Sequence, residues 1–183
     1  RHTLDGALVT PGLIDAHNHV GWLNGKPWSA TEAGVDPAVR WEHRHDWRKG
    51  KNDNPYVNVD GGSASKDQKA FGELRYLLGG GTAIFGSGDL GGLMRDLDST
   101  GSGENGLGLP GAQYDTFPLG DSGGTQLDGS CGYSSDGEPN DPQRAFVPHV
   151  AEGINGYARN EFLCMAGLAP GGSEVLDSDA ALI

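Results

Sequence analysis

Two histidines near the start of the chain have the spacing of metal ligands. His17 and His19 end an apolar run that begins at Pro11 and reads PGLIDAHNH. Side chains alternate along a β-strand, so we expect both imidazoles to lie on one side at the end of a buried strand. Neutral imidazole is a good ligand for zinc, iron and nickel. The spacing therefore predicts half of a metal site.

A third histidine and a glutamate occupy the end of a second apolar segment. His149 and Glu152 lie in residues 146–153, which read FVPHVAEG. Residues three apart cannot both point inward along one strand, so the strand must end near Ala151 and place Glu152 on a turn. Gly153 suits such a bend. Barrel enzymes carry their catalytic groups at this end of a strand.

Together these four residues could form the centre of a hydrolytic site. A divalent metal held by three imidazoles keeps an open position for water and lowers the pKa of that water toward neutrality. A neighbouring carboxylate can take the proton and later deliver it to a leaving amine. Taken alone, His149 reads more readily as a core histidine, and Glu152 as a helix-start residue favoured by the helix dipole. Beside His17 and His19, the metal site is the better interpretation.

The run PGLIDAHNH resembles the first-strand signature of the amidohydrolase superfamily of metal-dependent hydrolases. The segment HVAEG, with ARNEF at residues 158–162, is similar to the fifth-strand motif of the deaminase and chlorohydrolase branch of that superfamily. The likeness covers most of the chain and is looser outside the two motifs. It implies that His17, His19 and His149 are metal ligands. It also implies that Glu152 shuttles protons between the metal-bound water and the substrate.

The resemblance implies a single divalent metal ion, with zinc preferred and iron an alternative. Binuclear members of the superfamily use a carboxylated lysine on the fourth strand, and no lysine follows Lys69 in this chain. The mononuclear pattern also needs a histidine on strand six and an aspartate on strand eight. Both are expected beyond Ile183, because residues 180–183 read as the strand that would lead to that histidine. We therefore expect the isolated chain to bind metal weakly and to turn over poorly or not at all.

The elements that must position these residues alternate between strand and helix. Apolar runs predict strands at about residues 12–17, 82–85, 112–118 and 145–150. Helical periodicity predicts helices at residues 66–78, about 90–97 and about 155–166. The alternation favours an α/β fold with parallel strands. The strands counted up to His149 are one short of a full barrel series.

The resemblance implies a partial (β/α)8 barrel of the TIM type. A complete barrel needs roughly 250 residues, and this chain has 183. Residues 1–10 would be the end of a β-sandwich element, and residues 11–183 would form the barrel from strand one to just before strand six. The polar excursion from Gly21 to about Ser65 carries four tryptophans. Long loops of barrels lie over the active site, so these tryptophans either line a pocket or pack within the loop.

Composition and charge exclude several classes of protein. The net charge of −12 argues against nucleic-acid binding, which requires a basic face. The sequence contains no run of about 18 apolar residues, so it predicts no membrane-spanning helix. The 32 glycines exceed the roughly 7% average and predict many loops around a small core. A small-molecule substrate fits best, and the oligomeric state is left open.

The two cysteines allow two interpretations. Cys131 and Cys164 are either reduced and buried or joined in one disulfide. Because Cys131 lies in a polar, glycine-rich loop, we favour the disulfide. That choice favours an oxidising compartment, so a secreted or periplasmic location is preferred to a cytoplasmic one.

Three further motifs are expected to be incidental. The run GDSGG at residues 120–124 matches the nucleophile motif of chymotrypsin-like serine proteases, but that family's AAHC segment is absent, so a polar loop is expected. The run GSGDLG at residues 86–91 fits GxGxxG, but no strand would present the acidic residue that dinucleotide binding requires. The second His-x-His, formed by His43 and His45, is surrounded by charge and is expected in a solvated or lid segment that could contact substrate.

The resulting hypothesis is a hydrolase acting on C–N bonds other than peptide bonds, deaminase-like, with a metal-activated water. Two alternatives stay open. One is a cyclic-amide or dipeptide metallohydrolase on the same scaffold. The other is a non-catalytic remnant that binds metal or nothing at all. A barrel by itself would not decide among them, because barrels host many chemistries.

Overall fold

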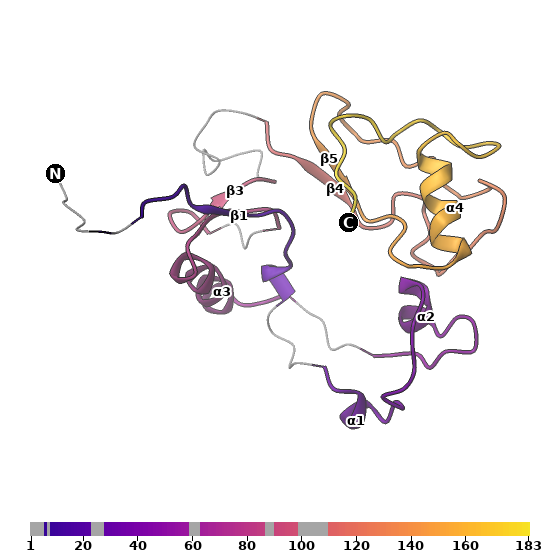
Figure 1. The fold of residues 1–183 in the computed structure, drawn as a ribbon, viewed down its shortest axis with the longest axis horizontal. Helices are drawn as coiled ribbons and strands as arrows, with labels where there is room; N and C mark the ends of the chain where they lie inside the picture. Colours follow the sequence, from indigo (N-terminus) through magenta and orange to yellow (C-terminus); the bar gives the residue numbers. More distant parts are fainter. Residues whose placement is uncertain (1–5, 7, 23–27, 59–62, 87–89, 99–109) are drawn as a thin grey trace. The chain divides into compact units, whose positions relative to one another are not determined.

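The strands of the computed structural model are short and pair in parallel (Figure 1). The structure describes residues 6, 8–22, 28–58, 63–86, 90–98 and 110–183. The chain divides into two units. The first comprises residues 1–24 and 63–109, and the second comprises residues 25–62 and 110–183. Each unit is described by itself below.

The first unit is built on a parallel sheet. Its strands are β1 (Leu13–Asp15), β2 (Gly81–Ile84) and β3 (Arg95–Asp96), in the order β1-β2-β3. Its helices are η1 (Val20–Trp22), a 3-10 turn, and α3 (Lys66–Leu78). The buried core consists of Val20, Ile84 and Met94, with Tyr76 and Leu77 packed against it.

Helix α3 has the bounds that the sequence predicts, because both of its ends are capped. The Ser65 hydroxyl accepts the Gln68 N–H, and the Gln68 side chain accepts the Ser65 N–H at 2.7 Å, which makes a capping box. At the other end, the N–H of Gly79 donates to the carbonyls of Arg75 and Tyr76. The helix is the last part of the connection between the parallel strands β1 and β2 and leads directly into β2.

Strand β1 lies at an edge of the sheet and is not buried as predicted. Leu13 is 65% exposed and Ile14 is 67% exposed. A strand at an edge has one neighbour only, so its apolar residues are covered on fewer sides. The apolar run therefore indicates a strand correctly but overstates its burial within this unit.

The helix predicted at residues 90–97 is wrong, because this segment is a turn followed by β3. Ile84 pairs with Asp96 across the β2–β3 ladder, and the N–H of Leu97 donates to the Ile84 carbonyl at 3.0 Å. Gly92 has a φ of +90°, which a right-handed helix does not allow. The correction supplies the strand that the sequence count lacked.

The second unit holds the remaining described strands and helices. The strands β4 (Gln113–Asp115) and β5 (Phe146–Pro148) pair in parallel. The helices are α1 (Ala30–Ala33), α2 (Arg44–Lys49) and α4 (Gly156–Met165). Helix α4 confirms the helix predicted at about residues 155–166, and the side chain of Asn155 caps it by accepting the Ala158 N–H.

The last residues of the chain extend alongside β5. The Ala181 N–H donates to the Phe146 carbonyl at 2.9 Å, and the Ile183 N–H donates to the Pro148 carbonyl at 3.2 Å. Phe146 and Ala180 form an isolated parallel bridge. The strand predicted at residues 180–183 is thus an extended segment parallel to β5, placed as the next strand of an α/β unit would be.

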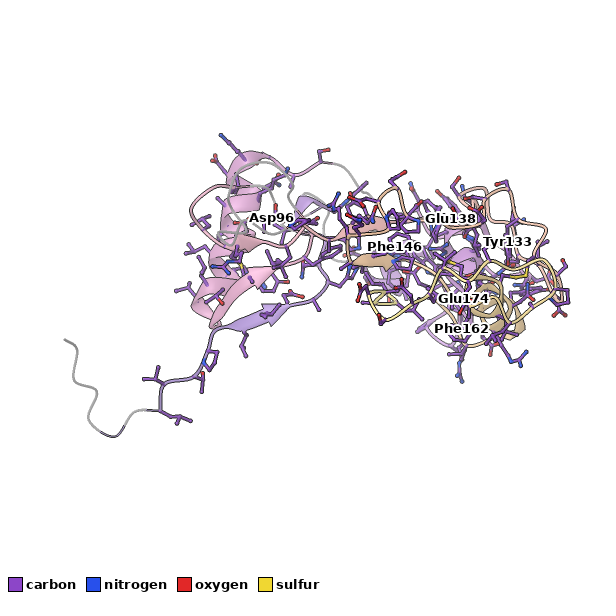
Figure 2. The ribbon with its side chains drawn as sticks, turned by 90° about the horizontal axis from the view of Figure 1, so that it is seen from above. Asp96, Tyr133, Glu138, Phe146, Phe162 and Glu174 are labelled. Carbon is purple, nitrogen blue, oxygen red and sulfur yellow. A yellow bond between two sulfur atoms is a disulfide. The ribbon has the colours of Figure 1, made fainter. Side chains whose placement is uncertain are left out.

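A disulfide secures the small core of the second unit. The core residues are Leu119, Phe146, Val150, Met165 and Val175, and Figure 2 labels Phe146 among the side chains. Cys131 and Cys164 are joined across a sequence separation of 33, which ties the polar loop before β5 to α4. A loop of that length implies a stabilisation of about 3–4 kcal/mol through the entropy of the unfolded chain. The compartment stays a prediction.

The larger architecture expected from the resemblance also stays a prediction. The described strands form two sheets and close no barrel. Most of the predicted β-sandwich remnant, residues 1–5 and 7, lies outside the described residues, and residues 8–10 have no regular secondary structure. None of the helices in the described ranges has the length and apolarity of a transmembrane span.

Candidate metal and acid–base site

His17 and His19 face each other at the carboxyl end of the sheet in the first unit. Their Nε2 atoms are 3.0 Å apart, and their rings meet edge to face at 4.6 Å between centroids. Two nitrogen ligands of a tetrahedral zinc ion, at the usual Zn–N distance, lie about 3.3 Å apart. The pair therefore has nearly the separation of two ligands of one ion.

A bend after β1 positions this pair, rather than the strand alternation that we predicted. The strand ends at Asp15, whose carboxylate accepts the N–H of His17 at 3.2 Å and the side-chain amide of Asn18 at 3.0 Å. The N–H of Asn18 donates to the carbonyl of Phe85 at 2.9 Å. These bonds fix the bend from both sides, and they bring two rings together that a regular strand would hold farther apart.

Gly86 lies directly against this bend. Its φ is +82°, and a Cβ at this position would lie 2.0 Å from the carbonyl oxygen of Asn18. Only glycine fits such an approach. Gly86 begins the GxGxxG run, of which residues 87–89 lie outside the described part of the chain. Its role here is to admit the bend that carries the histidines.

Two aspartates at the end of β3 were not anticipated from the sequence, because that segment was expected to be helical. Asp96, labelled in Figure 2, is fully buried, and its carboxylate accepts the N–H of Asp98 at 3.1 Å. Asp98 accepts the N–H of Gly86 at 3.1 Å. Burial, a hydrogen bond to Asp96 and the negative charge of Asp96 raise the pKa of Asp98 to about 7. Asp98 is therefore a carboxyl that holds its proton nearly to neutral pH.

His149 and Glu152 lie just after β5 in the second unit, as predicted. The N–H of His149 donates to the carbonyl of Asp115 at 2.9 Å, so His149 continues the β4–β5 pairing by one residue. The side chain of Glu152 is 29% exposed, whereas that of His149 is 7% exposed. The carboxylate is thus open to solvent on one side, as a group that exchanges protons with a ligand must be.

The turn between these residues differs in detail from the prediction. The positive φ of +60° is at Ala151, not at Gly153. The Glu161 carboxylate accepts the N–H of Ala151 at 2.9 Å and so holds the strained residue. A Cβ at Gly153 would lie 2.5 Å from the carbonyl oxygen of Glu42. Gly153 is therefore required for the close approach of two chain segments.

Two partners hold the Glu152 carboxylate ionised. Burial acts to raise the pKa of Glu152, but the hydrogen bond from His149 and the charge of Arg44 outweigh burial, so the pKa lies below its ordinary value. His149 Nδ1 lies 2.9 Å from Oε1, and Arg44 Nη1 lies 3.2 Å from Oε2. Because a carboxylate only accepts, Nδ1 carries the proton of this bond, and Nε2 is the ring nitrogen that a metal would use. Neutral imidazole binds metals through such a nitrogen.

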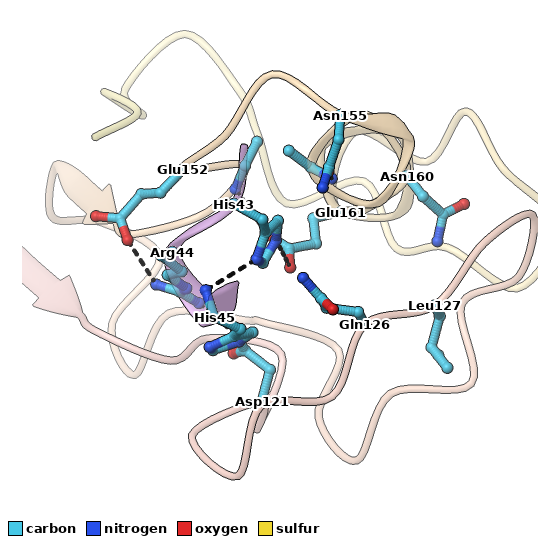
Figure 3. Close-up of polar contacts among 12 residues, drawn as sticks. His43, Arg44, His45, Asp121, Gln126, Leu127, Glu152, Asn155, Asn160 and Glu161 are labelled. Carbon is cyan, nitrogen blue, oxygen red and sulfur yellow. Dashed lines mark hydrogen bonds and ion pairs between the residues drawn. The ribbon is translucent and has the colours of Figure 1, made fainter. Parts of the chain in front are cut away.

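The segment around His43 and His45 is buried, so the prediction of a solvated segment is wrong. The two histidines are 2% and 0% exposed. His43 caps α2, because its Nδ1 accepts the N–H of His45 at 3.1 Å. Its Nε2 therefore carries the proton and donates to Glu161 at 2.9 Å (Figure 3). The His43 N–H donates to the carboxylate of Asp46, three residues later. That spacing of two capping residues was the sequence signal available for this helix start.

His43, His45 and Glu161 are grouped closely enough to hold a metal ion, since their ligand atoms lie within 4.8 Å of one another. The atoms are also engaged in hydrogen bonds. His45 Nδ1 accepts from Arg48 at 3.0 Å, and His45 Nε2 donates to Asp121 at 2.7 Å. An ion would have to replace some of these bonds, so the group is a complete polar network by itself.

Asp121, from the GDSGG run, is fully buried within this network. Burial acts to raise its pKa, but the hydrogen bond from His45 and the charge of Arg44 dominate and lower it. An Asp–His pair is thus present. A serine protease would need the other ring nitrogen of His45 to face the serine hydroxyl, and that nitrogen accepts from Arg48. Asp121 belongs to the buried network around Arg44, and the view that this motif is no protease site stays a prediction.

A cavity of about 370 Å³ lies beside Glu152 in the second unit. Trp41 and Trp47 line it, together with Arg44 and Ile154. Of the two roles left open for the tryptophans, these two therefore line a pocket. Trp28 packs edge to face on Trp41, with 5.7 Å between ring centroids.

The predicted site residues thus fall into two pairs. His17 and His19 are together in the first unit, and His149 and Glu152 are together in the second. Joining His149 to the first pair stays a prediction. Sequence reasoning missed the contacts that Arg44, Asp121 and Glu161 make around the second pair, because residues far apart in the chain supply them.

No family model matches this chain, and neither a curated protein nor a solved structure matches it. The resemblance to the amidohydrolase superfamily therefore stays a prediction from the two sequence motifs.

Substitution of Gly86 tests whether the close approach to Asn18 holds the histidine bend. Gly86→Ala should destabilise the protein more than Gly92→Ala does, by roughly 2 kcal/mol or more, because it adds a backbone clash to the strain of a positive φ. Gly92 is a matched control, since it has a φ of +90° and no atom lies within 4 Å of the position that a Cβ would take there. Urea unfolding measures the free energy of unfolding of both variants. Equal decreases in the two variants would contradict a role for Gly86 in holding the histidine bend.

The raised pKa of Asp98 makes the stability of the first unit depend on pH. The folded state binds this proton more tightly than the unfolded state, so the free energy of unfolding should fall as pH rises from about 4 to 8. Asp98→Asn should therefore raise the melting temperature at pH 8 and change it little at pH 5. Asp67→Asn, on an exposed turn of α3, removes the same charge as a control. An Asp98→Asn effect that is the same at both pH values would refute this.

Proposed function

We propose that this protein is a metal-dependent hydrolase of C–N bonds other than peptide bonds, with a deaminase-like mechanism. The observation that carries the proposal is the 3.0 Å separation of the His17 and His19 Nε2 atoms at the carboxyl end of a parallel sheet. Parallel α/β sheets place their functional groups at that end. Two ring nitrogens that face each other this closely suit a shared cation.

The order of the described strands supports the same proposal. Because β3 occupies the segment first expected to be helical, β5 is the fifth described strand along the chain. His149 follows β5 directly, which agrees with the fifth-strand position implied by the HVAEG motif. The extended segment beside β5 comes next along the chain, where the mononuclear pattern would have the strand that leads to its further histidine.

His17, His19 and His149 would hold the ion, and zinc suits three imidazoles best, with iron an alternative. When bound, such an ion supplies a water of lowered pKa as the nucleophile. The side chain of Glu152 then accepts a proton at Oε1 or Oε2 and returns it to the leaving nitrogen. Its ionised state and its partial exposure suit the accepting step. A small-molecule substrate would enter the cavity lined by Trp41 and Trp47.

The hydrogen bond from His149 to Glu152 gives this carboxylate a second role, which is to orient a metal ligand. A carboxylate that accepts from Nδ1 of a ligand histidine orients the ring and fixes its tautomer. Orientation affects metal affinity, whereas proton transfer affects turnover. Ligand orientation and proton transfer can therefore be separated by measuring the metal content and the turnover rate of the same variant.

Metal analysis tests the ligand assignment. His17→Ala and His19→Ala should each lower the bound zinc to a small fraction of the wild-type amount, because each removes one of the few ligands of the ion. His43→Gln is the matched control, since it removes a buried imidazole from the other histidine group. Zinc lost in His43→Gln and retained in His17→Ala would place the ion in the buried group and sink the proposal.

Glu152→Gln tests the proton-transfer role. We expect zinc content to be unchanged and kcat to fall by about 10²- to 10⁴-fold, since an amide cannot accept and return a proton. Ammonia release from aminopyrimidines, aminopurines and aminotriazines measures deamination, and ring opening of hydantoins measures the cyclic-amide alternative. Retained kcat would exclude the role, and loss of zinc would assign Glu152 to orientation. Wild-type protein without zinc or activity would favour the non-catalytic remnant.

A further inference from the structure

A buried arginine connects the elements around Glu152. Arg44 is the first residue of α2 and is 4% exposed. A buried guanidinium is costly unless its donors are satisfied and its charge is balanced. Its contacts therefore indicate which parts of the second unit it must hold.

The Nη1 group of Arg44 reaches the ends of both strands. It donates to the carbonyl of Thr116 after β4 at 2.8 Å and to the carbonyl of His149 after β5 at 2.8 Å. It also lies 3.2 Å from Oε2 of Glu152. One nitrogen thus contacts both strand ends and the carboxylate that lies beyond them.

The main chain reinforces this contact. The N–H of Arg44 donates to the carbonyl of Glu152 at 2.9 Å, and the N–H of Ile154 donates to the carbonyl of Glu42 at 2.8 Å. His43 and Gly153 form an antiparallel bridge between the same segments. The main chain of Arg44 is therefore held beside that of Glu152, which keeps the guanidinium within reach of the carboxylate.

The guanidinium is itself anchored on its other side. Its Nη2 donates to the carboxylate of Asp121, which also accepts from His45. The central carbon of the guanidinium lies 5.0 Å from the ring centroid of Phe117. These contacts commit Nη1 and Nη2 to protein acceptors, so Arg44 is suited to hold its neighbours in place, whereas Nε has no hydrogen-bond partner among the described residues.

We propose that Arg44 is the positioning residue of the acid–base site: it fixes the Glu152 carboxylate against His149 at the ends of β4 and β5. The Glu152 side chain is then clamped through both oxygens, by His149 at Oε1 and by Arg44 at Oε2. The catalytic consequence rests on the proposed function. The clamp itself is a statement about the folded protein and can be tested without activity.

Carbon-13 NMR of protein labelled at the glutamate carboxyls tests the clamp. The Glu152 resonance is the one that disappears in Glu152→Gln. Arg44→Gln and Arg44→Lys should both shift it at fixed pH, and guanidinium ion added well below denaturing concentration should restore it partly in Arg44→Gln. Arg144→Gln is the control, because Arg144 binds the main-chain carbonyls of Gly111 and Ala112 in the same unit. An unmoved resonance in the folded Arg44 variants, or an equal shift in Arg144→Gln, overturns the proposal.

A reciprocal measurement covers the case in which the Arg44 variants do not fold. Glu152 is partly exposed, so Glu152→Gln leaves the core intact. In nitrogen-15 spectra of this variant, the Arg44 Nη resonances should shift and their protons should exchange faster than in wild type. Glu32→Gln, in α1, is the control. Unchanged Arg44 resonances in Glu152→Gln would also overturn the proposal.

Kinetics separates positioning from the proposed function. On whichever heterocycle the wild type hydrolyses, Arg44→Lys should lower kcat by about 10- to 100-fold. It should leave KM and zinc content nearly unchanged because, in the described part of the chain, Arg44 contacts Glu152 and no side chain of a proposed ligand. An unaltered kcat would overturn the positioning role. Failure of the proposed function would instead appear as activity that survives Glu152→Gln, with the NMR shifts intact.

Discussion

A buried positive charge that must be neutralised organises the second unit. Arg44 is 4% exposed, and its charge is neutralised by ion pairs with two carboxylates, Asp121 and Glu152, from loops far apart in the chain. The same guanidinium satisfies main-chain carbonyls at the ends of β4 and β5. Asp121 and Glu152 share the neutralisation of this charge, and Asp121 is the more deeply buried of the two carboxylates.

The first unit depends on a different constraint, which is the close approach of two backbones. Gly86 lets the chain after β2 touch the bend after β1, and the bend carries His17 and His19. Here the interaction is steric and main-chain in origin, with no buried ion pair required. Both units therefore place candidate site residues at the carboxyl ends of parallel strands. A close backbone approach positions them in the first unit, and a buried ion pair does so in the second.

Periodicity in the sequence predicted the two longest described helices, and caps fix their ends in the structure. The capping box from Ser65 to Gln68 and the cap at Asn155 mark helices α3 and α4, both predicted closely. The helix predicted at residues 90–97 was wrong. Apolar residues at helical spacing also suit a turn followed by a short strand that pairs with β2. Pairing partners lie outside any local window, so no reading of that segment alone could find β3.

By itself the sequence determined which residue types could do the chemistry: the His-x-His pair, and a histidine with a glutamate three residues later. Their chemistry depends on side-chain type and short spacing, which local sequence contains. Only the tertiary structure decided that His43 and His45 are buried, that Cys131 and Cys164 are joined, and that Arg44 clamps Glu152. Burial and ion pairing arise from residues roughly 30 to 110 positions apart, whose encounter depends on the free energy of the whole fold.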